Sequence, residues 1–189
     1  MSEKNVLAIL GSPHTHRTTA AMLNLAVHKA EQAGYAVTKI NLYEKKLSFC
    51  TGCRICMDTH SCVQKDDIQE IVALLHKSQL VILAAPVYWA NVPAPVKNLF
   101  DRLLGTAMEE TNTFPKPRLR GKQYMILTSC NTPTPFSWIF GQSRGAIRSM
   151  DEFFKTAGMK PAGKVVCTNA KNKKELSKRI TKKMERCLK

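Results

Sequence analysis

Four cysteines gather within thirteen residues of this chain. They are Cys50, Cys53, Cys56 and Cys62, in the pattern C-x2-C-x2-C-x5-C. Thiolates at this close spacing suit an iron–sulfur cluster, whereas zinc usually takes two separated Cys/His pairs and disulfide scaffolds scatter their cysteines. The pattern predicts a [4Fe–4S] cluster as the metal group, with unoccupied thiols and zinc as the alternatives. Arg54 and Lys65 are the basic neighbours expected to tune its potential.

A second candidate site follows the first apolar run, residues 6–10. The sequence there is GSPHTHRTT, residues 11–19, and a helical pattern begins at about Thr19. Hydroxyls, backbone N–H groups and a helix N-terminus together make a phosphate cradle. We expect Ser12, Thr18 and Thr19 to donate hydroxyl hydrogen bonds, and Arg17 or His16 to add charge. The loop is neither a Walker A motif nor G-x-G-x-x-G, and an ordinary capped turn is the alternative.

Two further loops could enclose a flat ring. Residues 85–92 read APVYWANV and bring Pro86, Val87, Tyr88, Trp89 and Asn91 to the end of an apolar run. An aromatic pair there suits ring stacking, although it could also simply pack the loop. Residues 129–135 read SCNTPTP, and their Ser129 and Asn131 are expected to close the other side.

Strand and helix patterns alternate along the chain and explain why these loops should meet. Apolar runs predict strands at residues 6–10, 36–42, 80–85, 123–128 and 162–168. Helices are predicted from about Thr19, after an Asp67 cap, from Pro95, over 144–157 and over 171–189, with 105–121 as a polar connection. The pattern indicates an α/β fold: a flavodoxin-like, doubly wound, five-stranded parallel sheet in the order 2-1-3-4-5. Ligands of such sheets bind beyond the carboxyl ends of the strands, where the three loops emerge.

These motifs together resemble the NADPH-dependent FMN reductase group of flavodoxin-like proteins. The resemblance rests on GSPHTHRTT between strand and helix, on CVQKDD at residues 62–67, and on APVYW at 85–89 followed by KNLFDR at 97–102. Within the group, the cysteine insertion resembles the iron–sulfur flavoproteins. The likeness covers residues 5 to about 105 well and extends more loosely to about 168.

The resemblance implies a set of ligands and partners. It implies FMN, with its phosphate on Ser12 and the residues from His14 to Thr19, namely His14, His16, Arg17, Thr18 and Thr19. It implies an isoalloxazine ring against Pro86, Val87, Tyr88 and Trp89, and a [4Fe–4S] cluster on the four cysteines. NAD(P)H is the implied co-substrate, and homodimers or dimers of dimers are the implied assembly.

Length, cysteine count and charge indicate the domain organisation and the compartment of the protein. The 189 residues suggest one flavodoxin-like FMN-binding domain over 1–189, with a cysteine-rich loop at 44–66. Seven cysteines without a secretory signal predict a cytoplasmic protein, and no membrane span is expected. The net charge is +15, and residues 171–189 are predicted to form a basic amphipathic helix. A solvated basic face is favoured over nucleic-acid binding because no recognition motif accompanies it.

Lys97, Asp101 and Arg102 are expected at a helix surface, as an ion pair or a dimer contact.

We therefore predict an FMN-dependent oxidoreductase or electron-transfer flavoprotein, with the chemistry carried by the flavin rather than by a catalytic side chain. It would pass electrons between NAD(P)H or ferredoxin and a small acceptor. An NAD(P)H:FMN or quinone reductase without a cluster is the alternative. A non-enzymatic electron carrier is less favoured, because simple flavodoxins are usually acidic and this chain has a pI near 9.7. A nucleic-acid-binding redox sensor is the remaining reading.

Overall fold

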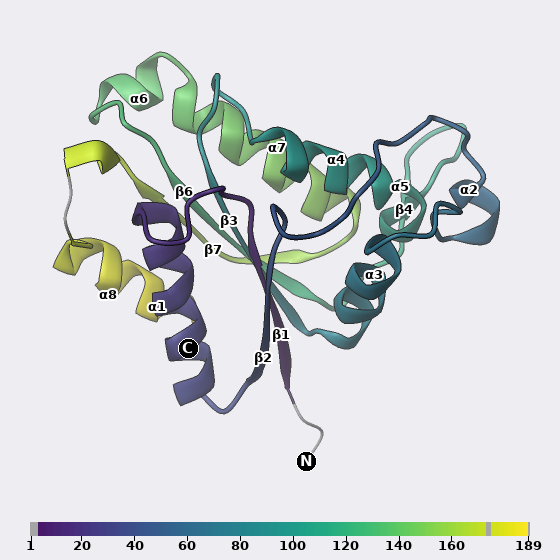
Figure 1. The fold of residues 1–189 in the computed structure, drawn as a ribbon, viewed down its shortest axis with the longest axis horizontal. Coiled ribbons are helices and arrows are strands. Elements are labelled where there is room, and N and C mark those ends of the chain that lie inside the picture. The colour runs from purple at the N-terminus through teal and green to yellow at the C-terminus, as the bar shows by residue number, and fades with distance from the viewer. Residues whose placement is uncertain (1–3, 173–174, 189) are drawn as a thin grey trace.

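Five parallel strands form one sheet in the computed structural model, which describes residues 4–172 and 175–188 (Figure 1). The strand order is β2-β1-β3-β6-β7. The strands are β2 (Ala36–Asn41), β1 (Asn5–Leu10), β3 (Leu80–Pro86), β6 (Gln123–Ser129) and β7 (Lys160–Cys167). Because β6 and β7 are the fourth and fifth strands of this sheet, the predicted flavodoxin-like order 2-1-3-4-5 is confirmed.

Helices cover both faces of the sheet, which explains the continuously apolar central strands. In Figure 1, α1 (Thr18–Gln32) and α8 (Lys178–Cys187) lie on one side. The other side carries α3 (Ile68–Lys77), α4 (Ala94–Arg102) and α7 (Gln142–Thr156). Every residue from Val6 to Leu10 and from Leu80 to Ala85 is buried, as expected for strands covered on both faces. Two hydrophobic clusters result, one on each face of the sheet.

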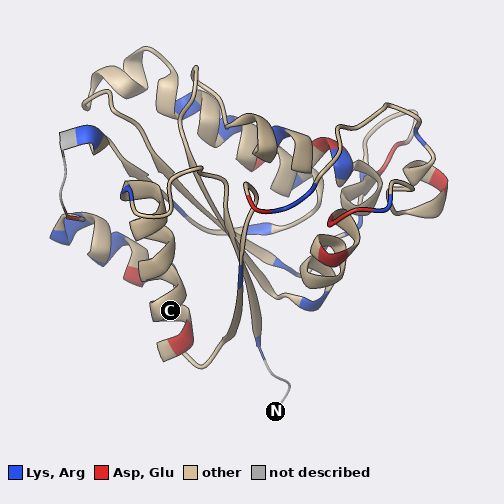
Figure 2. Cartoon of the chain, in the orientation of Figure 1, with Lys and Arg blue, Asp and Glu red and all other residues tan. Residues whose placement is uncertain are grey.

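The C-terminal helix is shorter than predicted. Residues Ala170–Asn172 form a 3-10 turn, and α8 begins only at Lys178, after Ser177. Ile180 and Met184 are buried against the sheet, whereas Leu176 packs against the same cluster from outside the helix. Leu176 therefore belongs to the apolar four-residue spacing that predicted the helix, although it lies before the first residue of α8. Residues 173, 174 and 189 of the predicted helix lie outside the described part of the chain. Most of the charged residues of α8 are Lys or Arg, which Figure 2 colours blue.

The predicted polar connection 105–121 also contains regular structure. A short helix α5 (Leu104–Ala107) continues from α4, and β4 (Met108–Glu109) pairs antiparallel with β5 (Lys116–Pro117). Two more short helices escaped prediction: α2 (Cys56–Thr59) and α6 (Phe136–Ile139). Each spans only four residues, which is too few to show a helical period in the sequence.

The cap predicted for α3 is supplied by a neighbouring residue. Asp66, rather than Asp67, accepts the backbone N–H of Ile68, at 3.0 Å. The Asp67 carboxylate instead accepts the N–H of Lys46, at 2.7 Å. Both carboxylates therefore tie the start of α3 to the segment that follows β2.

An ion network fixes α7 on the sheet. The Asp151 carboxylate accepts hydrogen bonds from Tyr124 of β6 and is paired with Lys164 of β7 at 2.5 Å and Lys155 at 2.8 Å. Partial burial alone would raise the pKa of Asp151, but the hydrogen bonds from Lys155, Lys164 and Tyr124 outweigh it and lower the pKa to about 2. Asp151 therefore stays ionised at neutral pH and keeps α7 in register with both strands.

Within the described residues, we find no helix both long and apolar enough to cross a bilayer.

Candidate functional site

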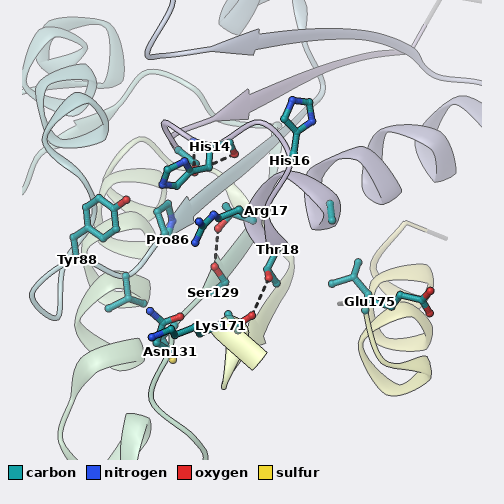
Figure 3. A pocket seen from close by; sticks show the side chains of 17 residues that line it. His14, His16, Arg17, Thr18, Pro86, Tyr88, Ser129, Asn131, Lys171 and Glu175 are labelled. Carbon is teal, nitrogen blue, oxygen red and sulfur yellow. Dashed lines mark hydrogen bonds between the residues drawn. The ribbon is translucent and has the colours of Figure 1, made fainter. Parts of the chain in front are cut away.

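A cavity of about 640 Å³ opens at the carboxyl end of the sheet. It lies where β1, β3 and β6 end, which is the ligand edge of this fold. Figure 3 shows its labelled lining residues converging from α1, from the end of β3 and from the segment after β6. Eleven of the thirteen residues predicted to bind FMN line it: Ser12, His14, His16, Arg17, Thr18, Thr19, Pro86, Val87, Tyr88, Ser129 and Asn131. A cavity of this size is typical for a cofactor.

The phosphate-loop end of the cavity is built around the start of α1. Arg17 occupies the N-cap position, yet its side chain caps none of the helix N–H groups. Thr19 and Ser129 join their hydroxyls at 2.6 Å, and the Thr18 hydroxyl donates to the Ala170 carbonyl at 3.3 Å. These contacts hold two hydroxyls beside the uncapped amino end of a fifteen-residue helix. The site therefore presents N–H and guanidinium donors beside these two hydroxyls, which suits a phosphate.

The loop after β3 separates two of the predicted ring contacts from the cavity. Tyr88 and Asn91 exchange backbone hydrogen bonds at 2.9 Å in both directions, and Trp89 and Ala90 between them have φ of 52° and 58°. This tight turn leaves Tyr88 on the cavity wall and turns Trp89 outward, with its whole side chain exposed. Neither Trp89 nor Asn91 lines the cavity, so the structure does not bring them to the predicted site.

A close helix contact supports this loop. Gly145 of α7 lies against the Ala90 backbone, so a Cβ at Gly145 would be 1.9 Å from the Ala90 carbonyl oxygen. Only glycine allows that approach without a shift of the loop. Sequence reasoning placed Gly145 inside a helix and gave it no role.

Sequence reasoning also missed one wall of the cavity. The additional lining residues are Ala21, Cys130, Ala170, Lys171, Glu175 and Leu176. Four of them follow β7 in the chain, and only the tertiary fold brings that segment beside α1. Lys171 adds a second cation, besides Arg17, to the lining (Figure 3).

The cysteine loop leaves the ligand edge instead of joining the cavity. After β2 the chain crosses to α2, which packs against α5 at the far end of α4 (Figure 1). Cys50 and Cys53 are exposed, Cys56 and Cys62 are half-buried, and none of the four lines the cavity. Within the described residues, which include the whole loop, no three Cys, His, Asp or Glu side chains are grouped closely enough to hold a metal ion.

Arg102 does not lie at a helix surface as predicted. Lys97 and Asp101 do form the predicted exposed ion pair, but Arg102 is 1% exposed and lies under the cysteine loop. Its guanidinium binds both carboxylate oxygens of Asp66, at 2.9 and 3.0 Å. Its Nε donates to Cys62 Sγ at 3.1 Å. Arg54, by contrast, is exposed and pairs with Glu110, and Lys65 is exposed.

The opposite charge of Asp66 explains how the buried Arg102 remains ionised. Burial alone would lower the pKa of Arg102, but its hydrogen bonds to Asp66 and Cys62 reverse the direction and raise it. Burial likewise would raise the pKa of Asp66, and the bonds from Arg102 and from the backbone of Ser48 and Ile68 lower it instead. A bidentate pair of this kind is among the stronger polar contacts in proteins.

The residues present fit FMN at the cavity and have the right chemistry for a cluster in the loop. The cavity offers phosphate donors at one end and the apolar Pro86 and Val87 with Tyr88 at the other. In the loop, Gly52, Arg54 and His60 have positive φ, and the backbone N–H groups of residues 50–55 donate to no acceptor among the described residues. An iron–sulfur site needs thiols to ligate the iron and N–H groups to donate hydrogen bonds to the sulfurs, and the loop has both. The described arrangement does not itself bring the thiols together.

Comparisons with known proteins place this geometry in a family. The family model described as "Flavodoxin-like fold" matches residues 4–189. An iron-sulfur flavoprotein of Archaeoglobus fulgidus is 39% identical over 61% of this chain and 50% of its own length. One of Methanocaldococcus jannaschii is 30% identical over 84% of this chain and 74% of its own length. The chain thus spans about half the length of the first of these relatives.

The fold is also shared with solved structures. An FMN-dependent NADH-azoreductase of Bacillus anthracis, in complex with FMN, superposes with a TM-score of 0.72 at 11% identity, covering 98% of this chain and 95% of its own. At that identity the likeness speaks for the fold alone. The family match over nearly the whole described chain agrees with the observed sheet order and ligand edge. The chain belongs to the family of proteins with the flavodoxin-like fold.

Proposed function

We propose that the chain is an FMN-dependent oxidoreductase that transfers electrons from NAD(P)H or a redox protein such as ferredoxin to a small acceptor. The observation that carries the proposal is the cavity itself: donors for a phosphate and a wall for a flat ring face one 640 Å³ space at the ligand edge. The azoreductase of the same fold is itself named for FMN and NADH, and we propose the same cofactor and donor here.

The chain's own residues would bind and orient the cofactor. Ser12, Thr18, Thr19 and the N–H groups of α1 would hold the phosphate, with positive charge from Arg17 and His16. Pro86, Val87 and Tyr88 would lie along the ring, and Ser129 and Asn131 would close the opposite side. When bound, the flavin supplies the redox chemistry, since it exchanges either a hydride or single electrons with its partners. We assign no catalytic side chain.

The two predicted residues that lie outside the cavity have a different place in this proposal. Trp89 is fully exposed on the turn beside the cavity mouth, and Asn91 serves that turn by accepting the N–H of Val92 at 2.8 Å. We propose that they contact a second copy of the chain or an incoming substrate rather than FMN in the same chain.

We propose that a second copy covers an apolar patch made by Phe136, Trp138, Ile139 and Phe140. These side chains are between 51% and 68% exposed, and large exposed apolar clusters commonly mark interfaces. Sedimentation equilibrium is expected to give a homodimer or a dimer of dimers, and Trp138→Asp is expected to shift it towards monomer. A monomeric wild type at tens of micromolar would contradict this assembly.

We also propose that the cysteine loop binds a [4Fe–4S] cluster through Cys50, Cys53, Cys56 and Cys62. The donor chemistry and the names of the iron-sulfur flavoprotein relatives support it. Assembly requires the four thiols to come together, because the described residues do not group three of them. Unpaired thiols in the loop, two of them exposed, also support a reducing compartment such as the cytoplasm.

One preparation tests both cofactors. Protein purified without oxygen is expected to contain about one FMN, four iron and four sulfide per chain. Cys53→Ser is expected to lose iron and sulfide but keep FMN, because Cys53 does not line the cavity. FMN without iron, even after anaerobic reconstitution, would leave a flavin reductase with no cluster. Absence of flavin affinity would overturn the proposed oxidoreductase.

A further inference from the structure

A stripe of polar residues on α4 and α5 is buried beneath the cysteine loop. Asn98, Arg102 and Thr106 stand at four-residue steps, and each is less than 8% exposed. Four-residue steps place side chains on one face of a helix. A polar side chain on a buried face destabilises the fold unless it is hydrogen-bonded. Here the hydrogen-bond partners all come from one segment, residues 47–66.

Backbone carbonyls of the loop supply most of those partners. The Asn98 amide donates to the carbonyls of Leu47 and Ser48, at 3.3 and 3.2 Å. The Thr106 hydroxyl donates to the carbonyl of His60, at 3.2 Å. Carbonyls before the first cysteine and between the third and the fourth are therefore bound by the same helical face.

Glycine completes this contact at the middle of the loop. A Cβ at Gly105 would lie 2.0 Å from the carbonyl oxygen of Cys56 and 2.6 Å from its carbonyl carbon. Both atoms are backbone, so a larger residue would force α2 away from α5. Residues 98–106 therefore contact the cysteine loop at three successive positions along α4 and α5.

Of the three polar residues in this stripe, Arg102 makes the most contacts, and one of them is to a cysteine sulfur. Besides Asp66 and Cys62, it donates to the carbonyls of Ser48 at 2.5 Å and Gln64 at 3.3 Å. Among the four loop thiols, all of which the structure describes, only Cys62 Sγ receives a hydrogen bond. The loop therefore has one sulfur held in place, next to a permanent positive charge.

We propose that Arg102 is a positioning residue for the cluster: it fixes the Cys62 sulfur and donates its Nε–H to it, while Asn98, Gly105 and Thr106 hold the rest of the loop. This inference rests on the cluster proposed above. Holding one ligand and both arms of the loop reduces the conformational entropy that cluster binding must overcome. A hydrogen bond to a ligating sulfur also raises the reduction potential of a cluster.

The midpoint reduction potential of the cluster distinguishes a positioning role of Arg102 from a purely structural one. A residue that only stabilised the loop would change how much cluster the protein holds. Loss of the Nε–H bond to Cys62 is expected in addition to lower the midpoint potential of the clusters that do assemble. Arg102→Lys keeps the positive charge for Asp66 but lacks a donor fixed at the Nε position.

The test compares wild type, Arg102→Lys, Arg102→Met and Gly105→Ala after anaerobic reconstitution with iron and sulfide. Lys97→Ala, on the exposed face of the same helix, is the matched control. Iron and sulfide are measured per bound FMN, and the midpoint potential is measured by spectroelectrochemistry. We expect about tenfold lower loading in Arg102→Met and Gly105→Ala, partial loading at a lower potential in Arg102→Lys, and wild-type values in Lys97→Ala.

The outcomes distinguish the two proposals. A wild type that assembles no cluster overturns the cluster and with it this inference. A loaded wild type together with Arg102 variants of unchanged loading and potential overturns the role of Arg102 alone. If Arg102→Met fails to fold, seen as loss of cooperative unfolding and of FMN, Arg102→Lys and Gly105→Ala decide: wild-type loading and potential in both overturn the inference.

Discussion

Riboflavin, which lacks the phosphate of FMN, is expected to bind this protein at least about a hundredfold more weakly than FMN. Hydrogen bonds to a charged group contribute about 1.5–3 kcal/mol each, and about 1.4 kcal/mol corresponds to a factor of ten in Kd. The N–H groups at the uncapped amino end of α1 and the Arg17 guanidinium together offer more than two such donors. Quenching of flavin fluorescence during titration of the flavin-free protein measures both constants.

Arg17→Ala sharpens that comparison. It is expected to weaken FMN about tenfold while leaving riboflavin nearly unchanged, because the guanidinium acts on the phosphate. Lys77→Ala removes an exposed charge at the other end of the sheet and should leave both constants as they are. Equal affinities for FMN and riboflavin in the wild type would show that the loop after β1 binds no phosphate.

Gly145→Ala is expected to weaken FMN binding by at least about tenfold. The new Cβ would lie 1.9 Å from the Ala90 carbonyl oxygen, so the turn from Tyr88 to Asn91 must move away from α7. Tyr88 lines the cavity on that turn, and its displacement removes part of the wall proposed for the ring. Overpacking of this kind typically costs about 1–3 kcal/mol.

Two measurements separate a local shift from general unfolding in this variant. Arg148→Ala, one turn further along α7 and exposed, is the matched control and should bind FMN normally. Thermal unfolding of Gly145→Ala should remain cooperative, since the ion network of Asp151 still holds α7 to β6 and β7. An unchanged FMN affinity in Gly145→Ala would mean that the loop after β3 does not form the ring site.

The cysteine loop bears on how the two proposed cofactors communicate. Because β2 neighbours β1 in the parallel sheet, the cysteine loop begins at the same edge as the phosphate loop. The structure confirms the sheet order, but the chain then crosses to α5 and leaves all four cysteines outside the cavity wall. A cluster in this loop would therefore not contact a flavin of the same chain directly, and the partner in a dimer is the alternative route.

Local patterns in the sequence determined the sheet, its order and most of the cavity lining. Buried central strands such as β1 and β3 are continuously apolar, and loops at their carboxyl ends must meet at one edge. These two rules predict from the sequence alone that Ser12, Thr19, Pro86, Ser129 and their neighbours lie together. They act between adjacent residues or adjacent strands, so a single sequence displays them.

Only the tertiary structure decided the contacts made between distant segments. Arg102 resembles an exposed helix residue in sequence, and its burial depends on Asp66 and Cys62, which lie 36 and 40 positions away. Gly145 and Gly105 matter because the backbones of Ala90 and Cys56 pass within reach of them. Likewise, Lys171 reaches the cavity because the segment after β7 lies beside the start of α1, where the Thr18 hydroxyl donates to the Ala170 carbonyl. Such contacts follow from how helices pack over the sheet, and no periodicity or short motif in the chain records that packing.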